Sequence, residues 1–171
     1  SQISIEGKTF KLPEPFFVIA TQNPRDQVGV FDLPESQIDR FSLCIDMDIL
    51  NSEDYLKILN EERMDTAILN TSYTKVSKSL KKVHFDNELQ VFLLKILDEI
   101  EKVSGKYLAI RPRVQLQNLA KVYAALKSRT FVVPEDILAL LLSSMRHRFH
   151  EMSKQEIEGM ILESVSSIKL P

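Results

Sequence analysis

The sequence is poor in the residues that mark specialised protein classes. It has no Trp, one Cys, four Gly and seven Pro among 171 residues. The single Cys44 excludes a disulfide framework and a cysteine-based zinc site, and is typical of a reducing compartment. The low Gly and Pro content, together with 44% hydrophobic and 27% charged residues, excludes collagen-like, low-complexity and disordered chains. We therefore expect a folded protein with a sizeable core.

Long apolar runs are also missing. The longest are residues 16–20 and 137–142, far shorter than the roughly 20 residues that a membrane-spanning helix needs. No secretory signal is recognisable, so we expect a cytoplasmic protein without a membrane partner. The first residue is Ser1 rather than Met, and we expect the chain to be a processed or excised piece of a longer protein.

Charge is balanced overall but uneven along the chain. The formal net charge is −2, yet residues 101–150 contain nine basic and three acidic residues. Such a local surplus suggests an anionic ligand or an acidic neighbouring surface, although charge alone favours a solvated helix face. No recognised nucleic-acid motif with interleaved aromatic residues accompanies it, and we expect no nucleic-acid partner.

The first 50 residues show the patterns of strands. Residues 1–5 and 8–12 alternate apolar and polar side chains around Glu6-Gly7, which predicts a hairpin. The apolar run at 16–21 is typical of a strand buried on both faces of a parallel sheet, and residues 43–49 alternate again. Between them, Pro34 suits the first turn of a short helix that ends near residues 39–41. This is a fragment of an α/β sheet rather than a whole one.

After residue 51 the pattern becomes helical. We expect helices capped by Ser52, by Asp86 with Gly105 at the other end, and by Ser153, and helices that begin at Pro112 and Pro134. The predicted apolar faces are Tyr55, Leu56 and Leu59; Leu89, Phe92, Leu93, Ile96, Leu97, Ile100 and Val103; Leu116, Leu119, Ala120, Tyr123 and Leu126; and Ile157, Met160, Ile161, Val165 and Ile168. The predicted organisation is an α/β portion at 1–50 and a helical domain at 51–171, helix-rich overall.

Two polar residues stand where the α/β portion could carry chemistry. Asn23 follows the strand at 16–21, and ligands bind at the carboxyl ends of strands in open α/β sheets. The structural alternative is an ordinary Asn-Pro turn, and this interpretation is favoured when Asn23 is considered alone. Arg40 ends the short helix, where a guanidinium could spread charge over phosphate oxygens. Taken alone, it too favours the plainer interpretation, a surface ion pair with a neighbouring acid such as Asp39.

Arg111 and Arg113 flank Pro112 in the first turn of a predicted helix. A cation at a helix N-terminus opposes the helix dipole, at a cost of up to about 1 kcal/mol. A bound polyphosphate would offset that cost, so functional and structural interpretations weigh about equally here. His147 and His150 have a spacing that can bind metal, but no carboxylate–histidine signature accompanies them, and we expect no metal site. No Gly-x-x-x-x-Gly-Lys-Ser/Thr loop is present.

Together these segments resemble the second half of a MoxR-family AAA+ ATPase. The segments that carry the resemblance are Phe16 to Pro24 for the sensor 1 strand, Gly29 and Leu33 to Phe41 for the arginine-finger helix, Ile110 to Arg113 for the Ser-Pro-Arg sensor 2 motif, and Val133 to Ile137 and Met145 to Arg148 for later lid segments. Residues 3–12 are similar to the family's hairpin before the sensor strand.

The resemblance implies a role for each matched residue. Asn23 would orient the attacking water, and Arg40 would reach into the nucleotide of a neighbouring subunit. Arg113 would contact phosphates from the lid, within or between subunits, and Arg111, which replaces the usual Ser, would add a phosphate contact. The family forms rings, commonly hexamers, that hydrolyse ATP with Mg²⁺ and act as chaperone-like remodellers of client proteins, which the sequence does not identify here.

Two departures shape the expectation for this chain. Val133 stands where a Thr cap is usual, so its helix would begin with fewer hydrogen bonds. The phosphate-loop lysine of Walker A and the Mg²⁺-binding acid of Walker B are both absent. The triphosphate therefore has no cradle and the metal has no ligand. We expect ATP and Mg²⁺ to be used by the full-length parent and not to be bound or hydrolysed by this chain alone. The competing interpretation is a helical protein-interaction module that needs no nucleotide.

Overall fold

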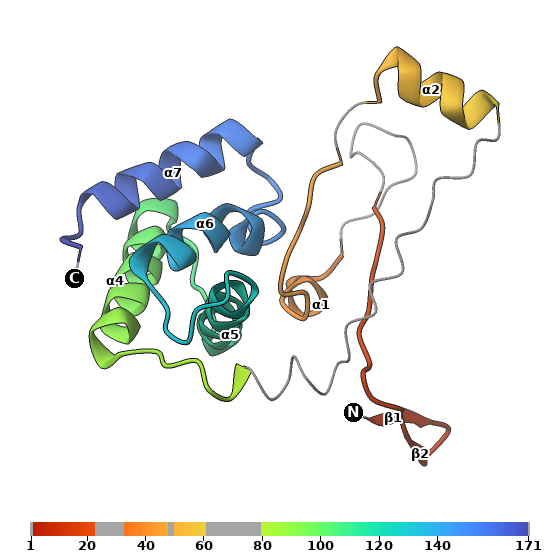
Figure 1. Cartoon of the computed structure of the whole chain (residues 1–171), viewed down its shortest axis with the longest axis horizontal. Coiled ribbons are helices and arrows are strands. Elements are labelled where there is room, and N and C mark those ends of the chain that lie inside the picture. Colours follow the sequence, from red (N-terminus) through yellow and green to blue (C-terminus); the bar gives the residue numbers. More distant parts are fainter. Residues whose placement is uncertain (1, 23–32, 48–49, 61–79, 171) are drawn as a thin grey trace. The chain divides into compact units, whose positions relative to one another are not determined.

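The computed structural model describes residues 2–22, 33–47, 50–60 and 80–170. The chain forms two compact units, one ending at Leu33 and one beginning at Pro34 (Figure 1). The helical unit thus begins earlier in the chain than residue 51, and the division of domains at 50/51 stays a prediction. No helix in the described part of the chain is both long and apolar enough to cross a membrane.

The N-terminal unit contains the predicted hairpin. Strands β1 (Gln2–Ile5) and β2 (Lys8–Lys11) pair antiparallel, with Ile3 opposite Phe10. The turn between them has positive φ at Glu6 and Gly7, a conformation that Gly adopts without strain. Every residue of both strands is exposed.

The two further strands predicted for this portion do not form in the described residues. Residues 16–22 have no ladder partner, and Phe17 and Ile19 are 73% and 79% exposed. The second segment, residues 43–47, is also without strand pairing, and Met47 is 89% exposed. A strand is stabilised by the strand beside it, so an apolar, extended sequence remains single when no described strand pairs with it.

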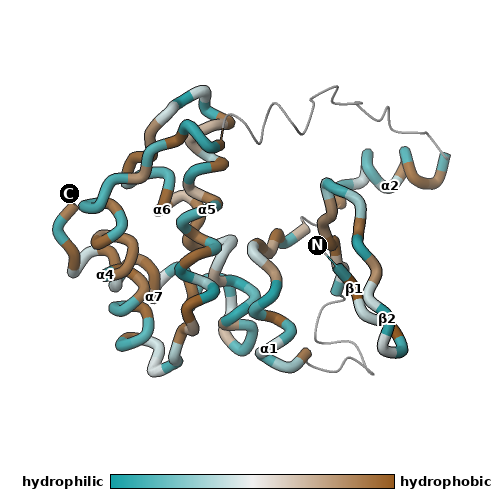
Figure 2. Tube along the Cα trace, turned by 90° about the horizontal axis from the view of Figure 1, so that it is seen from below, coloured by the Kyte–Doolittle hydropathy of each residue, from teal (hydrophilic) through white to brown (hydrophobic). Residues whose placement is uncertain are grey.

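The helical unit contains one short and five longer described helices. They are α1 (Glu35–Ile38), α2 (Ser52–Leu59), α4 (Asn87–Ser104), α5 (Ile110–Leu126), α6 (Pro134–Met145) and α7 (Lys154–Ser166). Helix α5 packs on α6 and α4, while α7 packs on α4 and α6. In Figure 2, apolar and polar positions alternate along these helices, as expected where one face is buried.

The core lies between α4, α5, α6 and α7. Its fully buried side chains include Ile96, Leu97, Ile100, Leu116, Ile137, Leu141, Met145 and Ile157. The predicted face of α4 is confirmed except for Val103, which is 38% exposed. The face predicted for α5 was partly wrong: its buried residues are Pro112, Leu116, Ala120 and Ala124, strictly four apart, and Leu126 is 74% exposed. Small residues at that spacing let α5 approach its neighbours closely.

Most predicted helix ends are confirmed, and two were wrong by one or two residues. Asn51, not Ser52, caps α2, since its Oδ1 accepts a hydrogen bond from the amide of Asp54 at 2.9 Å. Helix α5 begins at Ile110 rather than at Pro112. Proline is tolerated there because the first four amides of a helix have no intrahelical partner. The side chains of α2 are all at least partly exposed, including Tyr55 and Leu59.

The start of α6 compensates for the missing Thr cap. Val133 has no side-chain acceptor, but its amide donates to Oδ2 of Asp136 at 3.0 Å. Asp136 is only 1% exposed and forms a two-pronged ion pair with Arg129, whose Nη1 lies 2.7 Å from Oδ2. Burial alone would raise the pKa of Asp136, but Arg129 and the Val133 amide outweigh it and hold that pKa below its usual value.

Candidate functional site

The predicted arginine finger lies directly after helix α1. The helix ends at Ile38, Asp39 is its C-cap, and the amide of Arg40 donates to the carbonyl of Gln37 at 3.1 Å. Ile38 is buried and anchors the helix, whereas Arg40 is exposed. Arg40 thus has a backbone fixed by a helical turn and an exposed side chain.

Residues 35–46, which we call the finger segment, are attached to the helical unit at several points (Figure 1). Glu35 forms an ion pair of 2.6 Å with Lys106, which lies just after α4. The amide of Cys44 donates to the carbonyl of Ser143 at 2.8 Å, and burial raises the pKa of the Cys44 thiol. Asp46 pairs with Arg146 at 3.2 Å. These contacts hold the segment at both its ends.

The middle of the finger segment is held by Arg148, which follows α6. Arg148 is a buried guanidinium, with its side chain 2% exposed. Its Nε lies 3.2 Å from Oδ1 of Asp39, and its Nη2 donates to the carbonyl of Phe41 at 3.2 Å. The same Nη2 donates to Oε1 of Gln115 at 2.6 Å, and Nη1 donates to the carbonyl of Ser144. Burial lowers the pKa of Arg148, and Asp39 opposes that shift.

Gln115 on α5 completes this arrangement. Its Nε2 faces the carbonyls of Asp39 and Arg40 at 3.4 and 3.5 Å, while its Oε1 accepts from Arg148. One side chain therefore contacts both the finger segment and the residue that holds it. Gln115 is one helical turn after Arg111 on the same helix, and Arg111 is exposed.

His147 lies against the same carbonyl of Phe41. Its Nε2 is 2.9 Å from that oxygen and 2.7 Å from Nη1 of Arg148. A neutral ring nitrogen either donates to the carbonyl or accepts from the guanidinium, not both. Burial, followed by the positive charge of Arg148, lowers the pKa of His147 to about 4, so the ring is neutral at pH 7. Its Nδ1 is buried without a partner among the described residues.

Arg113 is held by two carboxylates of helix α4. Its Nη2 lies 2.7 Å from Asp98 and 3.2 Å from Glu101, both on α4, and its Nη1 donates to the carbonyl of Leu108 at 3.0 Å. Glu101 also accepts from the amide of Leu108 at 2.6 Å. The unfavourable position of Arg113 near a helix N-terminus is thus offset by two acids of α4. Its predicted contact with phosphate stays a prediction.

The remaining candidates from the sequence are Asn23 and the histidines considered as metal ligands. Asn23 lies outside the described residues, so its predicted role in orienting the attacking water stays a prediction. No cluster of three metal-ligating side chains occurs in the part of the chain that the structure describes. His150 has a buried Nδ1 without a described partner.

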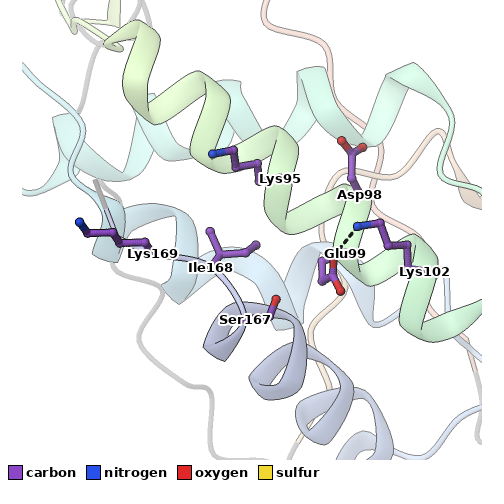
Figure 3. Close-up of a pocket in the computed structure, with 7 residues that line it drawn as sticks. All are labelled: Lys95, Asp98, Glu99, Lys102, Ser167, Ile168 and Lys169. Atoms are coloured by element: carbon purple, nitrogen blue, oxygen red, sulfur yellow. Dashed lines mark hydrogen bonds and ion pairs between the residues drawn. The ribbon is translucent and has the colours of Figure 1, made fainter.

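A shallow depression of about 320 Å³ lies between α4 and the end of α7, away from the finger segment (Figure 3). Its lining includes Lys95, Asp98, Lys102 and Lys169, and Lys102 is already paired with Glu99 at 2.7 Å. Three lysines and two acids line it, so the depression carries charges of both signs and does not specifically attract a charged ligand.

The residues that sequence reasoning missed are Arg148 and Gln115. Each stands directly before a buried apolar residue: Arg148 precedes Phe149 in the turn after α6, and Gln115 precedes Leu116 on α5. Arg148 stands in a segment that carries the family resemblance, but a sequence does not show which distant acid a guanidinium meets. That acid, Asp39, is 109 positions earlier.

Comparisons with known proteins place two parts of the chain in known families. Residues 1–43 match the ATPase family associated with various cellular activities (AAA), and residues 107–167 match the AAA lid domain. The chain is 28% identical to the uncharacterized protein YeaC of Bacillus subtilis, with 99% of this chain and 57% of that protein covered. It is 26% identical to the chaperone MoxR1 of Mycobacterium tuberculosis, with 96% and 50% covered. A magnesium-chelatase subunit ChlI homolog of Methanocaldococcus jannaschii is 25% identical, with 94% and 48% covered.

A solved structure from Cytophaga hutchinsonii, assigned as an ATPase, has the same fold. It superposes with a TM-score of 0.72 over 99% of this chain and 58% of that one, at 24% identity. The chain spans about half the length of the curated relatives it matches. It carries an AAA-family ATPase segment followed by an AAA lid domain, and it is homologous to the MoxR chaperone and to YeaC.

Proposed function

We propose that this chain is the finger and lid portion of a ring-forming, MoxR-type AAA+ ATPase, and that Arg40 is its arginine finger. The proposal rests on the combination of a fixed backbone and an exposed side chain at Arg40. Its neighbours Asp39 and Phe41 are both bonded to the lid, while its own side chain is exposed. A fixed backbone with an exposed guanidinium suits a group that must enter the site of an adjacent subunit.

In this proposal the remaining site residues also act on bound nucleotide. Asn23 orients the attacking water, and Arg113 with Arg111 contacts phosphate oxygens from the lid. ATP and Mg²⁺ bind to the phosphate loop of the full-length parent, which supplies the chemistry of phosphoryl transfer. Asp98 and Glu101 then compete with phosphate for the guanidinium of Arg113, since both contact it.

The biological output that we propose is chaperone-like remodelling of a partner protein in the cytoplasm. The printed name of MoxR1 is that of a chaperone, and the magnesium-chelatase homolog carries the name of a subunit of a larger enzyme. Both names suit an ATPase that acts on other proteins.

The alternative is a helical interaction module that works without nucleotide, and helix α2 favours it. Its apolar side chains Tyr55, Leu56 and Leu59 are 53%, 57% and 76% exposed. An exposed apolar helix face is typical of a docking surface, although it is equally compatible with a contact inside a ring.

The test is Arg40→Ala in the assembled ATPase. We expect kcat to fall by about 10³-fold or more, as for other arginine fingers, with nucleotide affinity changed by less than about twofold. Lys57→Ala removes another exposed cation and should have no effect. Turnover of Arg40→Ala at the wild-type rate would refute the finger, and partner binding that persists without nucleotide would favour the interaction module.

A further inference from the structure

We propose that Arg148 is a positioning residue for the arginine finger, which couples the lid to catalysis in the adjacent subunit. The inference rests on the proposed role of Arg40 and extends it to a residue that does not touch nucleotide. Arg148 binds the two residues on either side of Arg40, through the carboxylate of Asp39 and the carbonyl of Phe41.

The contact geometry uses the whole guanidinium. Nε faces Asp39 at 3.2 Å, Nη2 donates to Phe41 at 3.2 Å and to Gln115 at 2.6 Å, and Nη1 donates to Ser144. These acceptors come from the finger segment, from α5 and from α6. A planar, multidonor group is needed to reach all of them, and the point charge of a lysine would not. Burial of the side chain to 2% exposure keeps water from substituting for the protein acceptors.

The position of Arg40 consequently depends on the lid rather than on α1 alone. Helix α1 is a single turn of four residues, too short to be stable without tertiary contacts. Its C-terminal end is fixed from the lid by Arg148 and, through weaker contacts, by Gln115. A shift of the α6–α7 corner would move Asp39 and Phe41, and Arg40 lies between them.

Gln115 gives this connection a route to the first turn of α5. It accepts from Arg148 through Oε1, and its Nε2 approaches the carbonyls beside Arg40. Arg111 lies one turn earlier on the same helix. A phosphate bound at that first turn would therefore act on the same helix that supports Arg40. Phosphate binding in one subunit would then affect the arginine finger that this subunit presents to its neighbour.

The outer contacts of the finger segment supply a matched control. Arg146 pairs with Asp46 at 3.2 Å and donates to the carbonyl of Met152 at 3.2 Å, but it does not contact residues 39–41. Arg146→Gln removes a cation from the same corner and loosens the far end of the segment only.

The experiment compares Arg148→Gln, Arg148→Lys and Arg146→Gln in the assembled ATPase. For both Arg148 variants we expect kcat to fall about 10- to 100-fold, as when a catalytic group is misplaced, with KM for MgATP within about twofold of wild type. The double variant Arg40→Ala/Arg148→Gln should be no slower than Arg40→Ala alone, because both changes remove the same function. Arg146→Gln, which leaves the contacts to Asp39 and Phe41 in place, should lower turnover much less than either Arg148 variant.

Two results would overturn the positioning role while leaving the finger intact. One is wild-type turnover of Arg148→Gln when Arg40→Ala is inactive, and the other is fully additive loss in the double variant. An active Arg40→Ala would instead refute the proposed function itself. If Arg148→Gln does not fold, Asp39→Asn removes the same ion pair from the exposed side. A folded Asp39→Asn that turns over at the wild-type rate would also overturn the proposal.

Discussion

Nε of Arg148 lies 3.2 Å from Oδ1 of Asp39, across 109 positions of sequence. This contact joins the residue before the candidate finger to the corner between α6 and α7. Because the side chain of Arg148 is almost fully buried, the ion pair is less exposed to solvent and salt than a surface pair. The finger segment and the helical lid therefore form one compact unit.

The buried acid at the start of α6 should be critical for stability. Asp136 holds Arg129 and caps the amide of Val133 while only 1% exposed. We expect Asp136→Asn to lower the free energy of unfolding by about 1–3 kcal/mol, because it removes the charged acceptor that Arg129 and the Val133 amide share. Denaturant unfolding measures this. Glu135→Gln, at the exposed neighbouring position, should cost under about 1 kcal/mol, and equal losses in both variants would contradict the assignment.

His147 should make the stability of the helical unit depend on pH. Its pKa is about 4 in the folded protein and near 6.5 when unfolded, so the unfolded chain binds more protons between these values. Unfolding free energy should then fall as the pH drops from about 6.5 to 4, with a limiting slope of about 1.4 kcal/mol per pH unit from this group. Above pH 7 its contribution is constant.

The measurement is urea unfolding at several pH values, with variants that separate His147 from other titrating groups. His147→Gln should flatten the curve in this window, and His84→Gln, at a side chain that is 71% exposed, is the control substitution. A curve unchanged by His147→Gln would show that this histidine does not titrate differently in the two states.

Arg113 and the acids of α4 give a prediction about nucleotide binding. If Arg113 moves to a phosphate, Asp98 competes with that phosphate. Asp98→Asn should raise the nucleotide affinity of the assembled ATPase by up to about fivefold, the equivalent of one exposed ion pair. Glu99→Gln is the control, since Glu99 pairs with Lys102 instead. Equal affinities for the two variants would indicate that Arg113 does not reach the phosphates.

Hydrogen exchange should differ strongly between the two units. The strands β1 and β2 are exposed throughout, while α4, α5 and α6 bury the core. We expect amides of these helices to exchange more slowly, because exchange there requires sub-global or global opening. Mass spectrometry of proteolytic fragments resolves the two regions. Slower exchange in the hairpin than in α4 would contradict this expectation.

The features that could be predicted from sequence are local ones. The capping box from Ser153 to Glu156, the left-handed Gly105 at the end of α4 and Pro134 at the start of α6 all lie where expected. The first two depend on groups a few residues apart, and Pro134 on its own fixed backbone angle, so the sequence nearby is enough to locate them.

Tertiary contacts decided the rest. Residues 16–21 have the apolar composition of a central strand, yet no described strand pairs with them, because pairing depends on a partner and not on composition. Arg113 has an awkward place near a helix N-terminus, and its compensation comes from Asp98 and Glu101 of another helix. By itself, the sequence located most helix ends to within one or two residues and the apolar face of α4, since those signals act over one or two turns. Only the tertiary structure decided that Arg148 meets Asp39, because a buried charge is matched by whichever distant group the packing of helices brings to it.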